Sequence, residues 1–129
     1  MRDFDPTALA SRFAAHVNAK DLEGAIGLYE HSAIFVGPDG AQANGHEAIR
    51  RTLEAMIAAQ PRITNVEPGS AVVADDLAMM SSRWRITFGA FPDAPAVDGS
   101  STEVARRQAD GSWLYAIDWP NAQGQALET

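Results

Sequence analysis

The stretch Ser101-Thr-Glu-Val-Ala-Arg-Arg-Gln-Ala-Asp-Gly-Ser-Trp-Leu-Tyr-Ala-Ile-Asp-Trp-Pro120 decides the fold. Two runs of strand-forming residues flank the turn sequence Ala109-Asp-Gly111. An Asp-Gly pair between two such runs is a strong signal for an antiparallel hairpin. We therefore expect paired strands over residues 99–108 and 112–119.

Further strands are expected upstream of this hairpin. Turn residues at Glu67-Pro-Gly69 and Ala74-Asp-Asp76 separate three segments with strand composition. These segments cover residues 62–67, 70–74 and 77–89. Residues 89–100 form the longest irregular stretch, and the residues after Pro120 are expected to form a loose tail.

The N-terminal half is mainly helical by its apolar spacing. Asp5 followed by Pro6 favours a helix start, and Leu9, Phe13 and Val17 then recur on one face. Two further helices are expected, the first starting after Asp21 and including Leu22, Ala25, Ile26 and Tyr29, and the second covering residues 46–59. A short strand at 33–36 lies between them.

This order of elements favours one fold class. Helices are grouped before consecutive strands, which is typical of an α+β protein with an antiparallel sheet rather than of alternating βαβ units. With 129 residues, the chain is long enough for one domain with a core of its own.

Composition excludes several functions. The chain has no cysteine, so thiol catalysis and cysteine-based zinc sites are excluded. Its net charge of −7, with no basic stripe, argues against nucleic-acid binding. The sequence has no glycine-rich cofactor motif, metal-ligand spacing, signal peptide or membrane-length apolar run. We therefore expect a cytoplasmic protein with no cofactor, no metal, no nucleic-acid partner and no membrane association.

Several segments together carry a family resemblance. They are Arg12-Phe-Ala-Ala-His-Val-Asn-Ala-Lys-Asp-Leu-Glu-Gly-Ala-Ile-Gly-Leu-Tyr29, Ala33-Ile-Phe-Val-Gly-Pro-Asp-Gly40, Gly45-His-Glu-Ala-Ile-Arg50 and the stretch quoted first. The sequence resembles the SnoaL-like, ketosteroid-isomerase-like branch of the nuclear transport factor 2-like superfamily. The resemblance implies one domain over residues 1–129, with 121–129 as the tail. It also implies a cone-shaped antiparallel sheet curved around three N-terminal helices, a pocket at the open end, and commonly a dimer.

The residues that perform ketosteroid isomerisation are missing. By the resemblance, the tyrosine of that site falls on Phe13, the base falls on Gly37 and the second aspartate falls on Thr102. A phenylalanine cannot donate a hydrogen bond, a glycine cannot take a proton, and a threonine is a weak donor. The usual ketosteroid isomerase mechanism is therefore rejected.

Asp118 is the candidate acid or base. Alternation along the last strand puts Ala116 and Asp118 on one face and Tyr115 and Trp119 on the other. The resemblance points the first pair into the cone, where a desolvated carboxylate could transfer protons. The alternative is a structural role, in which Asp118 caps a loop or pairs with an arginine.

The orientation of the long strands is left open by the sequence. The resemblance aims a set of side chains at a small-molecule ligand: Phe13, His16, Val17, Arg83, Arg85, Thr102, Val104, Arg106 and Ala116. A slip of one residue reverses every side chain of a strand. It would put Met80, Trp84, Ile86, Trp113 and Tyr115 in the pocket and the arginines outside. In the unslipped orientation, Trp84, Tyr115 and Trp119 lie on the outer face of the sheet and form a homodimer interface.

Two functions follow from these observations. The first is a cofactor-independent isomerase or cyclase that transfers a proton on an apolar carbonyl compound. In it Asp118 acts as acid or base, and Arg83, Arg85, Thr102 or His16 stabilises an oxyanion. The second is a non-catalytic homodimeric protein that binds a ligand. His16 has its own alternative, as a core histidine whose ring is bound by a neighbour.

Overall fold

A computed structural model describes residues 5–37 and 39–120. The helical elements are η1 (Pro6–Ala8), α1 (Leu9–Asn18), α2 (Leu22–Ile26) and α3 (His46–Ala58). The strands are β1 (Tyr29–Val36), β2 (Gln42–Asn44), β3 (Pro61–Pro68), β4 (Val72–Ala74), β5 (Leu77–Phe88), β6 (Val97–Arg107) and β7 (Trp113–Pro120). The expected α+β fold is confirmed.

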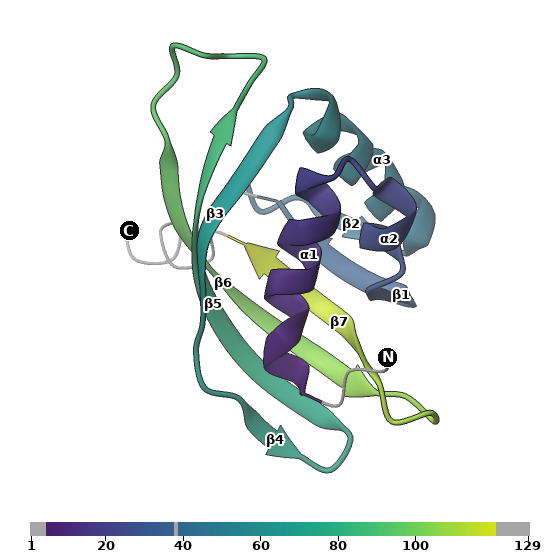
Figure 1. The fold of residues 1–129 in the computed structure, drawn as a ribbon. Coiled ribbons are helices and arrows are strands. Elements are labelled where there is room, and N and C mark those ends of the chain that lie inside the picture. Colours follow the sequence, from purple (N-terminus) through teal and green to yellow (C-terminus); the bar gives the residue numbers. More distant parts are fainter. Residues whose placement is uncertain (1–4, 38, 121–129) are drawn as a thin grey trace.

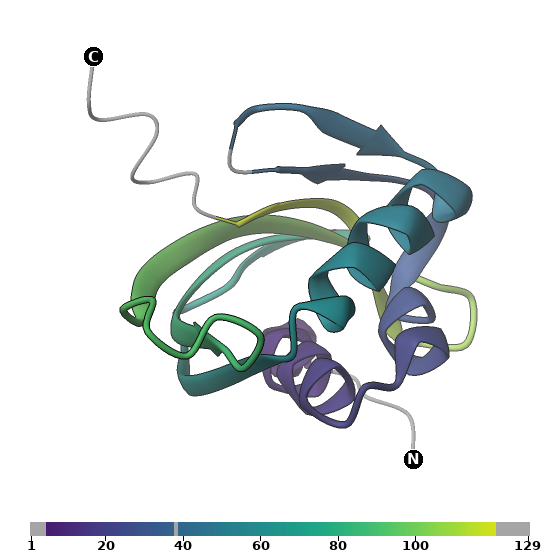
Figure 2. The ribbon, with the colours of Figure 1, turned by 90° about the horizontal axis from the view of Figure 1, so that it is seen from above.

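All strands belong to one curved sheet. Its order is β2-β1-β7-β6-β5-β3, and β4 pairs with β5. Only β1 and β7 are parallel neighbours among the described pairs. Figure 1 shows α1 crossing the face of the sheet, and Figure 2 shows the sheet curving around α1 and α3. The helices therefore cover the concave face.

The start of β1 differs from the sequence prediction. Tyr29 was expected in the second helix, but α2 ends at Ile26 and Tyr29 begins β1. The backbone N–H of Tyr115 donates to the carbonyl of Leu28 at 2.8 Å, so the chain joins β7 as soon as the helix ends. Strand β2 was not predicted, because three residues carry too little periodicity. The expected tail lies outside the described residues.

The apolar core occupies one end of the concave side. Leu9 and Val17 of α1 and Leu53 of α3 are at most 1% exposed, and they pack in one cluster with Tyr29 and Tyr115 of the sheet. Burying a large apolar side chain contributes about 1.5–3 kcal/mol, so this cluster fixes the helices on the sheet.

A β-bulge in β7 changes the alternation of its side chains. Along β6, Ala105 is paired with Tyr115, but Val104 is paired with Ile117, so Ala116 is an extra residue. An extra residue shifts the phase of a strand by one. Tyr115 and Asp118 therefore both face the concave side, where they are 2% and 6% exposed.

Candidate functional site

A cavity of about 520 Å³ opens between the helices and the concave face of the sheet. Residues of α1, α3 and five strands line it, and most of them are apolar. Its aromatic walls come from Phe13, Phe35, Trp84, Phe88 and Tyr115. A cavity of this size and composition is typical of small-molecule sites.

Asp118 lies in the wall of this cavity. The Tyr29 hydroxyl donates to Asp118 Oδ2 at 2.6 Å. Burial raises the pKa of Asp118 to about 7, the negative charge of Glu103 adds to this rise, and the Tyr29 hydrogen bond opposes it. Asp118 is therefore able to change protonation state near neutral pH.

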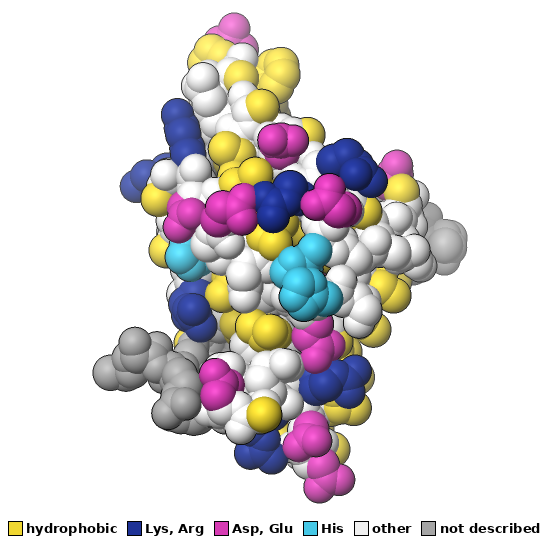
Figure 3. All heavy atoms as spheres, turned by 90° about the vertical axis from the view of Figure 1, so that its right-hand side faces the viewer, with side chains coloured by type: hydrophobic (Ala, Val, Ile, Leu, Met, Phe, Trp, Pro, Cys, Tyr) yellow, Lys and Arg dark blue, Asp and Glu magenta, His cyan; other side chains and the backbone are white. Residues whose placement is uncertain are grey.

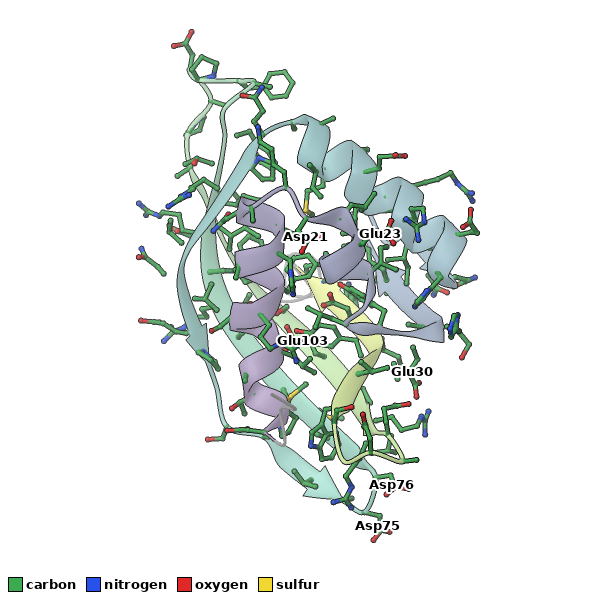
Figure 4. The ribbon with its side chains drawn as sticks, turned by 45° about the vertical axis from the view of Figure 1, so that its right-hand side comes forward. Asp21, Glu23, Glu30, Asp75, Asp76 and Glu103 are labelled. Carbon is green, nitrogen blue, oxygen red and sulfur yellow. The ribbon has the colours of Figure 1, made fainter. Side chains whose placement is uncertain are left out.

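Glu103 is a second buried carboxyl group in the same wall. It is 5% exposed, and it is directly opposite Asp118 in the pairing of β6 and β7. Figure 4 shows Glu103 on the concave side behind α1, far from Asp75 and Asp76 at the tip of the sheet. Cross-strand partners on one face have Cβ atoms about 4.5–5.5 Å apart, so the two carboxyl groups are close neighbours.

Two serine hydroxyls hold one oxygen of Glu103. Ser101 Oγ donates to Glu103 Oε2 at 2.6 Å, and the proton of Ser82 Oγ is shared between that oxygen at 3.2 Å and Ser101 Oγ at 2.8 Å. Burial raises the pKa of Glu103, whereas the hydrogen bonds from Ser101 and Ser82 lower it. Glu103 therefore has more support for its ionised form than Asp118, which has a single donor.

Within the described part of the chain, three oxygen atoms of the site have no hydrogen-bond partner. No hydrogen bond of the described residues reaches Glu103 Oε1, Asp118 Oδ1 or Tyr115 Oη. In the same part of the chain, no side-chain oxygen or nitrogen is both completely buried and unbonded. All three residues line the cavity, and Glu103 and Tyr115 also line a smaller pocket beside it.

Phe13 and Asp118 are the predicted site residues that line the cavity. Val17 is 0% exposed in the core instead. His16 Nδ1 lies 3.0 Å from Asp21 Oδ2, so its ring is bound beside the α1–α2 junction. Ala116 is the bulge residue and does not line the cavity.

The inward orientation predicted for the arginines is wrong. Their side chains are 48–77% exposed, and each pairs with an acid outside the cavity. Arg83 pairs with Glu67, Arg85 with Asp98 and Arg106 with Glu30. The other two inward predictions on β6, Thr102 and Val104, are also wrong, because Ser101, Glu103 and Ala105 take the buried positions.

The prediction that Trp84, Tyr115 and Trp119 all lie on the outer face of the sheet is wrong for two of these residues. Trp84 and Tyr115 line the cavity rather than the outer surface. Trp119 does face outward, where it is 38% exposed. The slipped orientation, considered as the alternative for β5, is therefore the one that the structure has, with Met80 and Ile86 also buried.

Sequence reasoning missed four polar residues of the site: Tyr29, Ser82, Ser101 and Glu103. A signal for one of them was present, because Ser82 alternates in phase with Trp84. Ser101 and Glu103 come to the same face through the pairing of β5 with β6, which the structure supplies. Tyr29 gave no such signal, because its spacing fits the helix before it.

The remaining histidines and the charged helix surface lie away from the cavity lining. His46 stacks on His31 at 4.4 Å between ring centroids, and His46 Nε2 lies 2.7 Å from the Tyr29 carbonyl oxygen. Arg50 pairs with Glu23 and Glu47. Figure 3 shows acidic and basic side chains interspersed on this face. It therefore has the character of an ordinary solvated surface.

Two further features are absent from the described residues. In residues 5–37 and 39–120, no helix is long and apolar enough to cross a membrane. The same ranges contain no group of three or more potential metal ligands.

Comparison with known proteins gives a family and a fold. A model of the SnoaL-like domain matches residues 10–116. A ketosteroid isomerase-like protein from Erwinia carotovora atroseptica is 19% identical, with a TM-score of 0.70 over 88% of this chain and 89% of that one. An NTF-2 like protein of unknown function from Shewanella oneidensis is 14% identical, with a TM-score of 0.71 over 87% and 92%.

A third similar structure carries a different description. It is a calcium/calmodulin-dependent protein kinase type II association domain from Thiobacillus denitrificans, 22% identical, with a TM-score of 0.74 over 89% of this chain and 92% of that one. At these identities the structures share the fold alone. No curated protein sequence matches the chain.

Proposed function

Because the chain belongs to the SnoaL-like family, we propose that its cavity binds an apolar small molecule on which Asp118 transfers a proton. The reaction class is a cofactor-independent isomerisation or aldol-type cyclisation of a carbonyl compound. The single observation that carries this proposal is Asp118 itself, a carboxyl group buried in a cavity wall with its pKa raised to about 7.

A pKa near neutrality suits both directions of proton transfer. The ionised form of Asp118 removes a proton from carbon next to the carbonyl group, and the acid so formed returns it elsewhere on the same molecule. General acid–base catalysis of this kind contributes about 10²–10⁴-fold to a rate. The Tyr29 hydroxyl stabilises the ionised form and fixes the orientation of the carboxyl group.

The lining limits the charge of the substrate. The described residues that line it include two carboxyl groups but no lysine, arginine or histidine side chain. An anionic ligand would therefore enter a desolvated site with no opposite charge, which is strongly unfavourable. We accordingly propose a neutral or positively charged substrate.

The test uses 2-tetralone, an apolar bicyclic ketone, as a probe. In D₂O, wild-type protein is expected to accelerate exchange of the protons next to the carbonyl, as measured by NMR. Asp118→Asn is expected to lose that acceleration by about 10²-fold or more. Glu67→Gln removes one carboxylate on the outside and is the matched control. Equal exchange with Asp118→Asn and wild type would contradict the proposal.

A non-catalytic binding protein is the second candidate. Phe13 and Gly37 line the cavity, so two positions that carry proton-handling groups in ketosteroid isomerases lack them here. Binding of 2-tetralone without acceleration of exchange would favour this candidate.

We also propose that the chain forms a homodimer through the outer face of the sheet. An apolar row crosses five strands there, and its members are paired with one another: Val72, Met79, Val104, Ile117 and Ile34. Val72 and Met79 are 71% and 58% exposed. Trp119 lies beside this row, so it remains part of the proposed interface while Trp84 and Tyr115 do not.

A further inference from the structure

We propose that the cavity selects ligands that carry a protonated amine, and that the ammonium group binds between Glu103 and Asp118. This inference rests on the proposed function only in taking the cavity as the ligand site. It names the chemical class of that ligand, an apolar body with one ammonium group.

The first support is the charge of the cavity. Glu103 and Asp118 are opposite each other on neighbouring strands, both are at least nine-tenths buried, and both line the cavity. The structure describes no cationic side chain in the lining. A buried carboxylate is normally paired, so this pair lacks the counter-charge that a buried carboxylate requires. A cationic ligand group would supply it.

The second support is the number and kind of free acceptors. Glu103 Oε1, Asp118 Oδ1 and Tyr115 Oη belong to residues that line the cavity, and these atoms have no partner among the described residues. A primary ammonium group has three N–H donors and no acceptor.

The third support is the aromatic wall. Trp84, Phe13 and Phe35 line the same cavity. Aromatic faces attract cations, and this attraction is stronger in a desolvated site. An apolar body with an ammonium group is therefore complementary to both the walls and the carboxyl pair.

Three probes of matched shape test the inference: 2-(1-naphthyl)ethylamine, 2-(1-naphthyl)ethanol and 1-naphthaleneacetate. They are respectively cationic, neutral and anionic at about pH 8, because an alkylamine resembles the lysine side chain, with a pKa of about 10. Isothermal titration calorimetry gives the dissociation constant of each. We expect the amine to bind about tenfold or more tighter than the alcohol, and the anion to bind weakest.

Substitutions then test whether the two carboxyl groups cause the preference for the amine over the alcohol. Glu103→Gln and Asp118→Asn each remove one buried charge with little change of shape, and each is expected to lower the amine-to-alcohol affinity ratio about tenfold. Glu67→Gln, which removes an exposed carboxylate outside the cavity, is expected to leave the ratio unchanged. Thermal unfolding of each variant shows that the fold is retained.

The pH dependence gives an independent readout. The titratable groups facing Asp118 are Glu103 of β6, Tyr29 of β1 and Tyr115 of β7, while α1 and α3 contribute only uncharged residues to the lining. Between about pH 6 and about pH 8, ionisation of Asp118, whose pKa is about 7, is expected to tighten amine binding and to leave alcohol binding nearly constant.

The outcomes separate this inference from the proposed function. Equal affinities for the amine and the alcohol, or a ratio unchanged in both cavity variants, would overturn the inference and leave the proton-transfer proposal standing. Amine selectivity without 2-tetralone exchange would support the inference and contradict the catalytic proposal. If none of the three probes binds, both the inference and the assignment of the cavity as a ligand site are overturned.

Discussion

At the scale of single residues, the feature that matters most is a carboxyl group without a counter-charge. Asp118 has one hydrogen-bond donor, the Tyr29 hydroxyl, and its nearest charged neighbour is another acid, Glu103. Burial and like charge both disfavour ionisation, so folding raises the pKa of this group. The ionised Asp118 therefore lowers the free energy of unfolding of the protein, and strongly shifted pKa values of this kind are common at functional sites.

This cost predicts a specific effect of pH on stability. The pKa of Asp118 is about 7 in the folded protein, against an ordinary value of 3.8. Between these values the folded protein holds a proton that the unfolded chain has released, so this group lowers the free energy of unfolding as pH rises. Asp118→Asn removes the effect.

We expect the free energy of unfolding of Asp118→Asn, relative to wild type, to increase from about pH 4 to about pH 7 and then level off. The slope is at most about 1.4 kcal/mol per pH unit. Urea unfolding at several pH values measures it. A difference that stays flat, as we expect for the exposed control Glu67→Gln, would show that Asp118 keeps an ordinary pKa.

At the scale of elements, the bulge in β7 decides what the cavity contains. Strict alternation would put Tyr115 and Asp118 on opposite faces, and the extra residue Ala116 brings them to the same one. An aromatic core residue and a carboxyl group thus share the concave face within four residues of chain. With Ala116 present, strict alternation could not place both on that face.

The bulge can be tested by changing the number of residues in it. Deletion of Ala116 restores simple alternation, with Tyr115 and Asp118 still on the concave side, so we expect the fold and the raised Asp118 pKa to persist. Insertion of a second alanine after Ala116 shifts the phase again and turns Asp118 outward. Carboxyl ¹³C NMR titration then gives a pKa near the ordinary value of 3.8 for the insertion. A raised pKa in the insertion variant would contradict this account.

At the scale of the whole molecule, the curved sheet has two faces with different roles. Its concave face holds the core and the cavity, and its convex face carries the arginine–acid pairs and the apolar row described above. Large exposed apolar patches on a sheet usually mark a contact with another molecule. A second copy of the chain is the occupant that we propose.

Self-association is checked with a substitution in the middle of this row. Ile117→Glu puts a charge among the paired apolar residues, so we expect a dimer in wild type and a monomer in the variant. Light scattering at micromolar concentration distinguishes them. Ala109→Glu adds the same charge at the exposed β6–β7 turn and should remain dimeric. A wild-type monomer would contradict the dimer.

The sequence by itself determined the α+β class and the family, and it predicted a role for Asp118. Turn chemistry, apolar spacing and the Asp-Gly hairpin are local, so they can be read without a structure. The family resemblance aimed Arg83, Arg85, Thr102 and Arg106 at the pocket, and Glu103 was overlooked. Alternation shows which side chains of a strand share a face, but it does not show which face is concave.

Only the tertiary structure decided which face lines the cavity. The helices bury the concave face, and burial favours Trp84, Ile86 and Tyr115 over arginines that can remain paired in water. The bulge at Ala116 then added Asp118 to that face, and strand pairing set Glu103 opposite it. Both depend on contacts between residues distant in the chain, which is why local sequence patterns could not predict them.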